Sequence, residues 1–232
     1  MISVNYFVAL VCFFQFSSGI NFRTENDGKF KYIFNGKNFD GWHIVIDGDN
    51  NASLATNIFK AEQGGIIHIS GEKFGYLCTD KVYKNFHLKL EFKWGEKKWE
   101  PKLKDPRDSG ILYGITDEKN VVSESVWPRS IECQIQEGDT GDFWLVNEST
   151  IEVDGVKTIP GRFVQAKKKL DAENPKGEWN TVEVIFMNGH SKHIVNGVLV
   201  NEGFNASETT GKILIQSEGA EVFYRNIKLK KL

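Results

Sequence analysis

Cysteine and proline are scarce in this chain, whose 232 residues include three cysteines and five prolines. Because Cys12 falls in an N-terminal apolar run, Cys78 and Cys133 are the two left for a folded domain. Two cysteines cannot build a metal cluster of the Cys-x2-Cys kind, and a chain of this length can bury a core without disulfide staples. Cys78 and Cys133 each lie in an apolar strand pattern, so a disulfide and two buried free thiols both stay open.

An excess of charge of either sign is also missing. The 29 lysines and arginines nearly balance the 31 aspartates and glutamates, which leaves a formal net charge of −2. The longest basic run is Lys167-Lys168-Lys169, which is too short to follow a phosphate backbone. A near-neutral chain has no general field that gathers nucleic acid or an anionic membrane. We therefore expect no nucleic-acid partner.

No apolar stretch is long enough to span a bilayer. The longest candidate, Phe7–Phe14, lies inside the uncharged segment Met1–Gly19 and is followed by the small residues Ser17-Ser18-Gly19. These features predict a signal peptide over residues 1–19, although the usual basic residue before the apolar run is absent. An uncleaved anchor and a buried strand are the alternatives. Cleavage would leave residues 20–232 as a single domain of an exported protein, which would be periplasmic, secreted or displayed at the cell surface.

Apolar spacing of helical period is absent from every long window, whereas alternation of period two recurs. Apolar and polar residues alternate along Phe86–Trp94 and again along Ile131–Ile135. Asn-Gly pairs, which suit two-residue hairpins, follow at Asn188-Gly189 and Asn196-Gly197, so Trp179–Val200 is predicted to form a three-stranded meander. The pattern predicts an all-β fold, an antiparallel β-sandwich or jelly roll. The charged segment Glu96–Arg107 interrupts it as a long loop.

Seven short motifs, in the same order, resemble those of one protein family. The first four are Phe34-Asn35-Gly36-Lys37 with Gly41-Trp42, the strand Phe86–Phe92, Asp108-Ser109-Gly110-Ile111, and Ile131–Ile135. The others are Pro175–Asn180, Val195-Asn196-Gly197, and Gly211–Gln216 with Arg225-Asn226-Ile227. From about Tyr32 to Leu232 the chain resembles the 3-keto-disaccharide hydrolase family.

The resemblance implies a concanavalin A-like jelly roll whose concave side binds sugar. Relatives are typically secreted or periplasmic bacterial proteins, and some cleave glycosides whose sugar has first been oxidised to a ketone at carbon 3. One departure is visible. Many members carry a histidine near the end of the domain where this chain has Glu218, within Gln216-Ser217-Glu218-Gly219. A role that depends on that histidine cannot be transferred to this chain.

Glu132, Gln134 and Gln136 form the most informative group of polar residues. If Ile131, Cys133 and Ile135 point into the sandwich, these three side chains point out together. A carboxylate flanked by two amides suits the binding of sugar hydroxyls, because amides both donate and accept hydrogen bonds. A solvated polar face without a role is the alternative.

Asp108, Glu132 and His68 are the candidate acids and bases. Hydrolysis of an ordinary glycoside needs two carboxyl groups, and Glu132 could pair with Asp108 or Glu218. A 3-keto sugar needs less, because the ketone acidifies the hydrogen on carbon 2, so one base can remove it and expel the leaving group. A cation would then stabilise the enolate: Arg107, a lysine or a divalent metal ion. A lone strand histidine such as His68 is also commonly structural.

The remaining candidates would bind the substrate. Tyr113, Trp127 and Trp144 lie in or near these strands and could stack on sugar faces, although core packing explains each equally well. Gln216 and Glu218 follow from the family motif at the end of the domain.

Two functions stay open at this level. The first is an exported glycoside hydrolase or lyase, and the second is a non-catalytic, lectin-like carbohydrate-binding module on the same fold. Burial of Glu132 or Asp108 beside a second acid or a metal would favour the enzyme. A groove lined by exposed carboxylates and rings would favour the binding module. A structural surface domain is a third reading.

Overall fold

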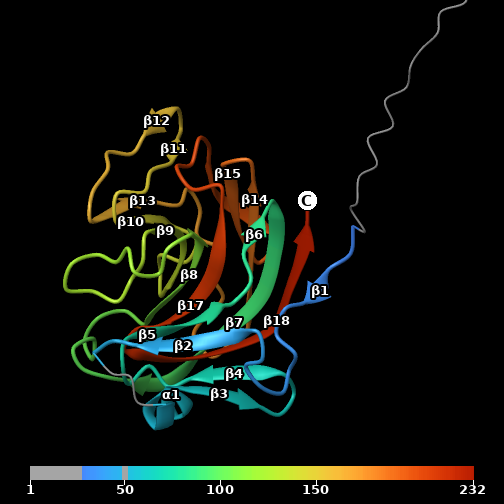
Figure 1. The fold of residues 1–232 in the computed structure, drawn as a ribbon, viewed down its shortest axis with the longest axis vertical. Helices are drawn as coiled ribbons and strands as arrows, with labels where there is room; N and C mark the ends of the chain where they lie inside the picture. Colours follow the sequence, from blue (N-terminus) through green and yellow to red (C-terminus); the bar gives the residue numbers. More distant parts are fainter. Residues whose placement is uncertain (1–27, 49–51) are drawn as a thin grey trace, which may run out of the picture.

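The computed structural model describes residues 28–48 and 52–232, which form two eight-stranded antiparallel sheets packed face to face (Figure 1). The predicted all-β jelly-roll sandwich is confirmed. The predicted signal peptide, residues 1–19, lies outside the described residues. The described part of the chain contains no helix long and apolar enough to cross a membrane.

The first sheet has the strand order β16-β15-β14-β7-β18-β4-β3, with β1 paired to β18. Its strands are β1 (Lys31–Tyr32), β3 (Phe59–Glu62), β4 (Ile66–Ile69), β7 (Phe86–Lys98), β14 (Asn180–Met187), β15 (His190–Val195), β16 (Val198–Gly203) and β18 (Ala220–Lys231). Strands β14, β15 and β16 are the predicted meander.

The second sheet has the order β13-β10-β9-β8-β17-β5-β2, with β6 paired to β17. Its strands are β2 (Trp42–Ile46), β5 (Gly75–Thr79), β6 (Tyr83–Lys84), β8 (Asp108–Ile115), β9 (Ser130–Gln136), β10 (Phe143–Val146), β13 (Phe163–Ala166) and β17 (Thr210–Ser217). A short helix, α1 (Ala52–Ile58), leads into β3, and β11 (Glu152–Val153) with β12 (Val156–Lys157) forms a separate hairpin.

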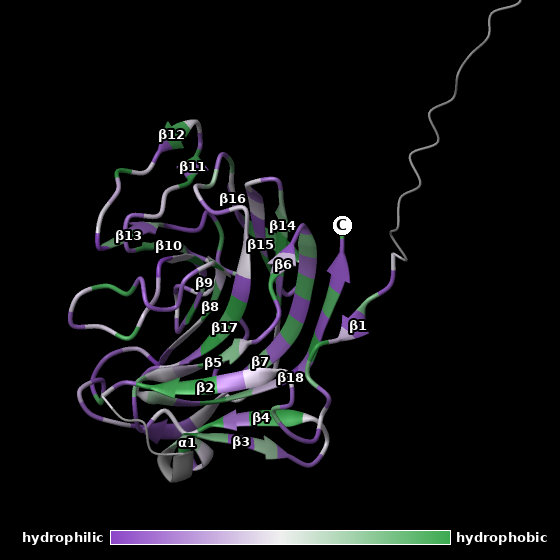
Figure 2. Cartoon of the chain, viewed as in Figure 1, coloured by the Kyte–Doolittle hydropathy of each residue, from purple (hydrophilic) through white to green (hydrophobic). Residues whose placement is uncertain are grey.

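The core lies between the two sheets and follows from the alternation in the sequence. Along β7, buried Phe86, Leu88 and Leu90 alternate with half-buried polar residues, seen as alternating green and purple bands in Figure 2. The inward residues of β9 face them from the second sheet. At the turn between β14 and β15, Asn188 and Gly189 both have positive φ, as a tight hairpin requires.

Strand register places a row of side chains on the outer face of the second sheet, away from the core. Glu132 on β9 is paired with Leu112 on β8 and with Trp144 on β10, while Ile131 and Cys133 point into the core. Gln134 is paired with Gly110 one step along the strands. The outer face of this sheet therefore carries the polar residues predicted to bind sugar.

Cys78 and Cys133 are free thiols on opposite faces of the second sheet. Cys133 belongs to the core between the sheets, whereas Cys78 belongs to a smaller apolar cluster on the outer face. A disulfide would have to pass through the sheet, so that alternative is excluded.

Candidate active site

A pocket of about 310 Å³ opens on the outer face of the second sheet. Eight of the residues predicted from sequence line it: Asp108, Trp127, Glu132, Gln134, Gln136, Trp144, Gln216 and Glu218. They come from β8, β9, β10, β17 and the loops beside them. The pocket is therefore built at the centre of the sheet, where neighbouring strands fix the relative positions of the side chains.

Lys102 is a lining residue that the sequence did not single out. It lies in the loop 99–107, and its ammonium group contacts Asp108 and lies 3.0 Å from Glu218 Oε1. Burial opposes the charge on Lys102, but the two carboxylates more than offset this and raise its pKa. Lys102 is therefore a fixed cation between Asp108 and Glu218. A divalent metal ion bound by these two acids would need the position that the ammonium group occupies.

The loop that carries Lys102 is anchored to the strand ends. Trp99 accepts a backbone hydrogen bond from Lys102, donates one to Gly219, and donates from its indole to the Ser70 carbonyl. Gly219 has φ +80°, and a Cβ there would lie 2.8 Å from the Lys102 Cβ. A side chain at this position would displace Lys102, which explains the glycine after Glu218.

Glu132 is the acid of the three that lacks a countercharge. It is 6% exposed, and no ion pair to it is found in residues 28–48 and 52–232. Burial, together with the nearby charges of Glu218 and Asp108, raises its pKa well above the usual value. Its surroundings thus favour the protonated form of Glu132 more than solvent would.

Asp108 and Glu218 share the Lys102 ammonium and titrate together. Burial raises the pKa of Asp108, although Lys102 and a hydrogen bond from Gln136 act in the opposite direction. Burial and the Asp108 charge raise the pKa of Glu218 to about 8. A carboxyl whose pKa lies near neutrality can both take and return a proton, as general acid–base catalysis requires.

Gly110 makes the close packing at the floor of the pocket possible. A Cβ built at Gly110 would overlap the Glu132 carboxylate and the Gln216 amide oxygen. Both side chains lie across the glycine, and Gln216 is 2% exposed. The glycine in the Asp108-Ser109-Gly110 motif is therefore required by the two side chains that cross it.

Three buried polar atoms of the pocket have no hydrogen-bond partner among the described residues. They are Trp144 Nε1, a donor, and the acceptors Gln216 Oε1 and Asp108 Oδ1. Leaving such groups unpaired in a buried position costs free energy. A donor and an acceptor that line an open pocket are suited to a ligand that carries hydroxyl groups. Phe163, another lining residue that the sequence did not single out, adds an aromatic wall.

Three predicted site residues lie elsewhere, each for a clear reason. Tyr113 points into the core, where its hydroxyl lies 2.7 Å from Ser191 Oγ and 3.0 Å from His193 Nε2, because it shares the inward face of β8 with Ile111. Arg107 turns away to pair with Glu137 at 2.9 Å and to donate to the Gly95 carbonyl.

His68 lies on the first sheet, and so on the other side of the sandwich from the pocket. Its Nε2 is 3.1 Å from Glu221 Oε1, and its ring stacks on Phe223 with centroids 4.6 Å apart. On β4 the neighbours Ile67 and Ile69 take the inward positions, which directs His68 outward. The structure therefore gives His68 a structural ion pair and no place beside the three acids.

The sequence profile described as the 3-keto-alpha-glucoside-1,2-lyase-like domain matches residues 29–230. The match spans nearly the whole described chain and includes every residue of the pocket. None of the curated proteins matches at a significant level.

Solved structures with the same fold include three of different kinds. A putative glycosyl hydrolase from Parabacteroides distasonis is 23% identical, with a TM-score of 0.59 over 88% of this chain and 94% of its own. The carbohydrate-binding module CBM66 from Bacillus subtilis is 7% identical, with a TM-score of 0.54 over 82% and 96%. A β-glucanase from Bacillus licheniformis is 13% identical, with a TM-score of 0.50 over 88% and 97%. At these identities the likeness establishes the fold.

Proposed function

The chain belongs to the 3-keto-alpha-glucoside-1,2-lyase-like family, and from that premise we propose that it cleaves the glycosidic bond of a saccharide or glycoside oxidised to a ketone at carbon 3. The observation that carries the proposal is the burial of Glu132 beside Asp108 and Glu218 in an open pocket. Strongly perturbed acids in a cleft are typical of catalytic sites. A pocket that only bound sugar would have no use for buried acids of raised pKa.

The ketone sets the chemistry, because it acidifies the hydrogen on carbon 2. A base removes that proton, and the C–H electrons form an enolate with the carbon 3 oxygen. When the enolate collapses, the ketone re-forms, a double bond forms between carbons 1 and 2, and the bond from carbon 1 to the leaving oxygen breaks. The leaving oxygen takes a proton from an acid. Addition of water to the unsaturated product would complete a net hydrolysis.

The pocket offers a group for each of these steps. We assign the base to the Asp108–Glu218 pair, since the pKa of Glu218 lies near neutrality. Glu132, whose burial favours its protonated form, is assigned as the acid for the leaving oxygen. Lys102 has three N–H donors, of which two face Asp108 and Glu218. Its third N–H is available to the enolate oxygen. A fixed cation stabilises this negative charge more strongly in a buried site than in water.

The walls of the pocket supply the binding of the sugar. Trp127, Trp144 and Phe163 offer apolar ring faces, which suit the C–H faces of a pyranose. Gln134, Gln136 and Gln216 offer amides for its hydroxyl groups. The volume of about 310 Å³ fits one sugar unit, with the second unit or aglycone at the open side.

The test compares Glu132→Gln with a control that changes a similar acid elsewhere. Glu173 is half-buried, has a raised pKa and accepts hydrogen bonds from Thr140 and Trp94 outside the pocket. We expect Glu132→Gln to lose about 10²–10⁴-fold in kcat on a 3-keto glycoside, with Glu173→Gln close to wild type. Equal turnover in wild type and Glu132→Gln would remove Glu132 from the mechanism. Saccharide binding without turnover in the wild type would make the chain a binding module.

We also propose that the protein is exported, on the strength of the uncharged apolar segment at its N-terminus. The N-terminal sequence of the protein purified from its source tests this. A mature chain that begins near Ile20 supports export with cleavage, and an intact Met1 in a cytoplasmic fraction contradicts it.

A further inference from the structure

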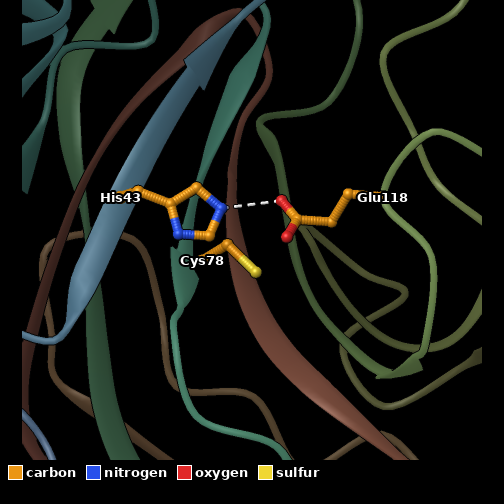
Figure 3. Close-up of side chains that lie close together, drawn as sticks. All are labelled: His43, Cys78 and Glu118. Atoms are coloured by element: carbon orange, nitrogen blue, oxygen red, sulfur yellow. Dashed lines mark hydrogen bonds and ion pairs between the residues drawn. The ribbon is translucent and has the colours of Figure 1, made fainter.

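A second cluster of reactive side chains lies on the outer face of the second sheet, outside the pocket. His43 on β2, Cys78 on β5 and Glu118 in the loop 116–129 bring one ligand atom each to within 4.8 Å of the others (Figure 3). Cys78 and His43 are neighbours in register on paired strands. The ring nitrogen, the thiol and the carboxylate come from three separate segments and converge on one point.

The histidine is oriented as a metal ligand would be. Asp80 Oδ1 lies 2.6 Å from His43 Nδ1, and Glu118 Oε2 lies 2.7 Å from Nε2, so a carboxylate oxygen faces each ring nitrogen. A carboxylate that holds the far nitrogen of a histidine is the usual outer partner of a zinc site. With the Nδ1 proton held by Asp80, Nε2 is the nitrogen that can bind a metal once the proton it shares with Glu118 is released.

Glu118 is held in a similar way. Its Oε1 accepts from Lys212 at 2.6 Å, and its Oε2 accepts from Tyr76 at 3.3 Å. Lys212 thus neutralises one oxygen and leaves the other, Oε2, directed towards His43 Nε2. Two outer residues, Asp80 and Lys212, orient the two polar ligands of the cluster from outside.

We propose that His43, Cys78 and Glu118 bind one zinc ion, with a fourth position left for water. The ligand set decides the metal, since a thiolate with an imidazole and a carboxylate favours zinc over magnesium or calcium, which prefer oxygen ligands alone. In a tetrahedral site with bonds of about 2.0–2.3 Å, ligand atoms lie about 3.3–3.6 Å apart. His43 Nε2 and Glu118 Oε2 must separate by about 0.6 Å to reach this spacing.

Binding displaces two protons: the one shared by His43 Nε2 and Glu118 Oε2, which leaves to solvent, and the thiol proton of Cys78. The thiol is buried and donates a weak bond of 3.6 Å to the Thr79 carbonyl. Its S–H bond breaks, the proton leaves to solvent, and the sulfur electron pair forms the bond to zinc. No oxidation or reduction accompanies this exchange.

The site would fix one wall of the sugar pocket. Cys78 and Glu132 lie in the same row of the sheet, three strands or about 14 Å apart, with Leu214 and Leu112 between them. The loop 116–129 covers these two leucines through Val122, Val126 and Trp127. Its beginning supplies Glu118 to the cluster, and its end supplies Trp127 to the pocket. Zinc would therefore hold this loop against the sheet.

The test titrates the full-length, metal-depleted protein with cobalt(II), which substitutes for zinc and absorbs strongly when bonded to a thiolate. We expect one cobalt per chain with a sulfur-to-cobalt absorption band, displaced by zinc. The band should vanish in Cys78→Ser and in His43→Ala. Asp80→Asn should weaken metal binding about 10–100-fold. Since His43 is half-exposed, its variant should fold even if replacement of the buried Cys78 perturbs the sheet.

The matched control is His190→Ala, which breaks a similar pair, His190 Nε2 with Glu202 Oε1 at 2.7 Å, on the first sheet. It should leave cobalt binding unchanged. Absence of the thiolate band in the wild type, or a band that persists without Cys78 and His43, would overturn the proposal. Hydrogen exchange across residues 116–129 should slow on zinc binding in wild type and not in His43→Ala. Unchanged exchange in metal-bound wild type would contradict the role in holding the loop.

Discussion

The Lys102 ammonium lies 3.0 Å from the Glu218 carboxylate, although 116 residues separate them along the chain. Lys102 also contacts Asp108, so one lysine neutralises two acids while Glu132 has no such partner among the described residues. This asymmetry separates the acids into a pair that can lose a proton and a single acid that keeps it. Acids with distinct environments are the usual sign of distinct roles in catalysis.

Replacing Lys102 should therefore affect catalysis more than binding. In Lys102→Met we expect kcat on a 3-keto glycoside to fall about 10²–10³-fold, because the enolate loses its cation. The pKa values of Asp108 and Glu218 should rise, since both now feel burial without the lysine, and the alkaline shift of the rising limb of the pH profile measures this. Lys102→Arg should recover part of the activity. A pH profile that does not move would contradict the assignment.

Stability should fall as the pH rises through the range in which Glu218 ionises. Its pKa of about 8 in the folded protein lies above the ordinary 4.5, so the folded state binds the proton more tightly than the unfolded state. That contribution is complete below pH 4.5 and lost by about pH 8, with a slope of at most about 1.4 kcal/mol per pH unit for one group. Thermal unfolding measured from pH 5 to pH 8, a span of about three pH units, detects this loss of stability.

Buried His193 acts in the opposite direction at lower pH, because burial lowers its pKa to about 3. The informative quantity is thus the difference between wild type and Glu218→Gln, which mimics the protonated acid. Between about pH 5 and pH 8, where Glu218 ionises, we expect the variant to lose less stability than the wild type. Parallel curves would mean that Glu218 titrates normally.

Gly110→Ala tests the packing at the pocket floor. The added methyl group would overlap Glu132 and Gln216, so one or both must move. We expect a loss of about 1–3 kcal/mol in unfolding free energy and a fall in kcat of at least about tenfold, since a small misplacement of a reacting group is costly. Chemical denaturation and steady-state kinetics measure the two effects. Wild-type behaviour in both would show that Glu132 does not cross the glycine.

Trp144→Phe tests the unpaired indole donor. The substitution keeps a ring on the wall and removes Nε1, for which residues 28–48 and 52–232 supply no hydrogen-bond partner. If Nε1 donates to a sugar hydroxyl, the saccharide dissociation constant should rise about 2–10-fold, the value of one hydrogen bond. The fold should be as stable as wild type or slightly more so, because a buried unpaired donor is lost. Calorimetry with the saccharide decides, and unchanged affinity would exclude the contact.

Tyr113→Phe distinguishes the core role of Tyr113 seen in the structure from the sugar-binding role predicted from the sequence. The hydroxyl bonds to Ser191 and His193 in the core, so its removal should destabilise the protein by about 1 kcal/mol. The affinity for saccharide and the KM should not change. A specific rise in KM without loss of stability would restore Tyr113 to the binding site.

Strand alternation was enough to predict the sandwich and the outward direction of Glu132 and Gln134. Period-two patterns report which face of a strand is buried, and β9 keeps that pattern without a bulge. The same reasoning could have placed Tyr113, which shares the inward phase of Ile111. The sequence left core packing and stacking on sugar equally open for Tyr113. The structure places it in the core, where the opposite sheet supplies partners for its hydroxyl.

Lys102 could not have been identified in this way. It belongs to an irregular loop, where side-chain direction follows from contacts such as Trp99 with Ser70 and not from any period. The charged segment Glu96–Arg107 predicted the loop, and the proposed reaction predicted a cation in the site. Only the tertiary structure shows which of the lysines in this loop is that cation. The same limit applied to Arg107, which is close in sequence and turned towards Glu137.

The most direct test of the proposed chemistry follows the hydrogen on carbon 2 of a 3-keto glycoside labelled there with deuterium. We expect the wild type to release the aglycone with loss of that deuterium to solvent and a primary isotope effect on kcat/KM, and Glu132→Gln to be slow in bond cleavage. Release of the aglycone with full retention of deuterium would contradict removal of this proton by the Asp108–Glu218 pair.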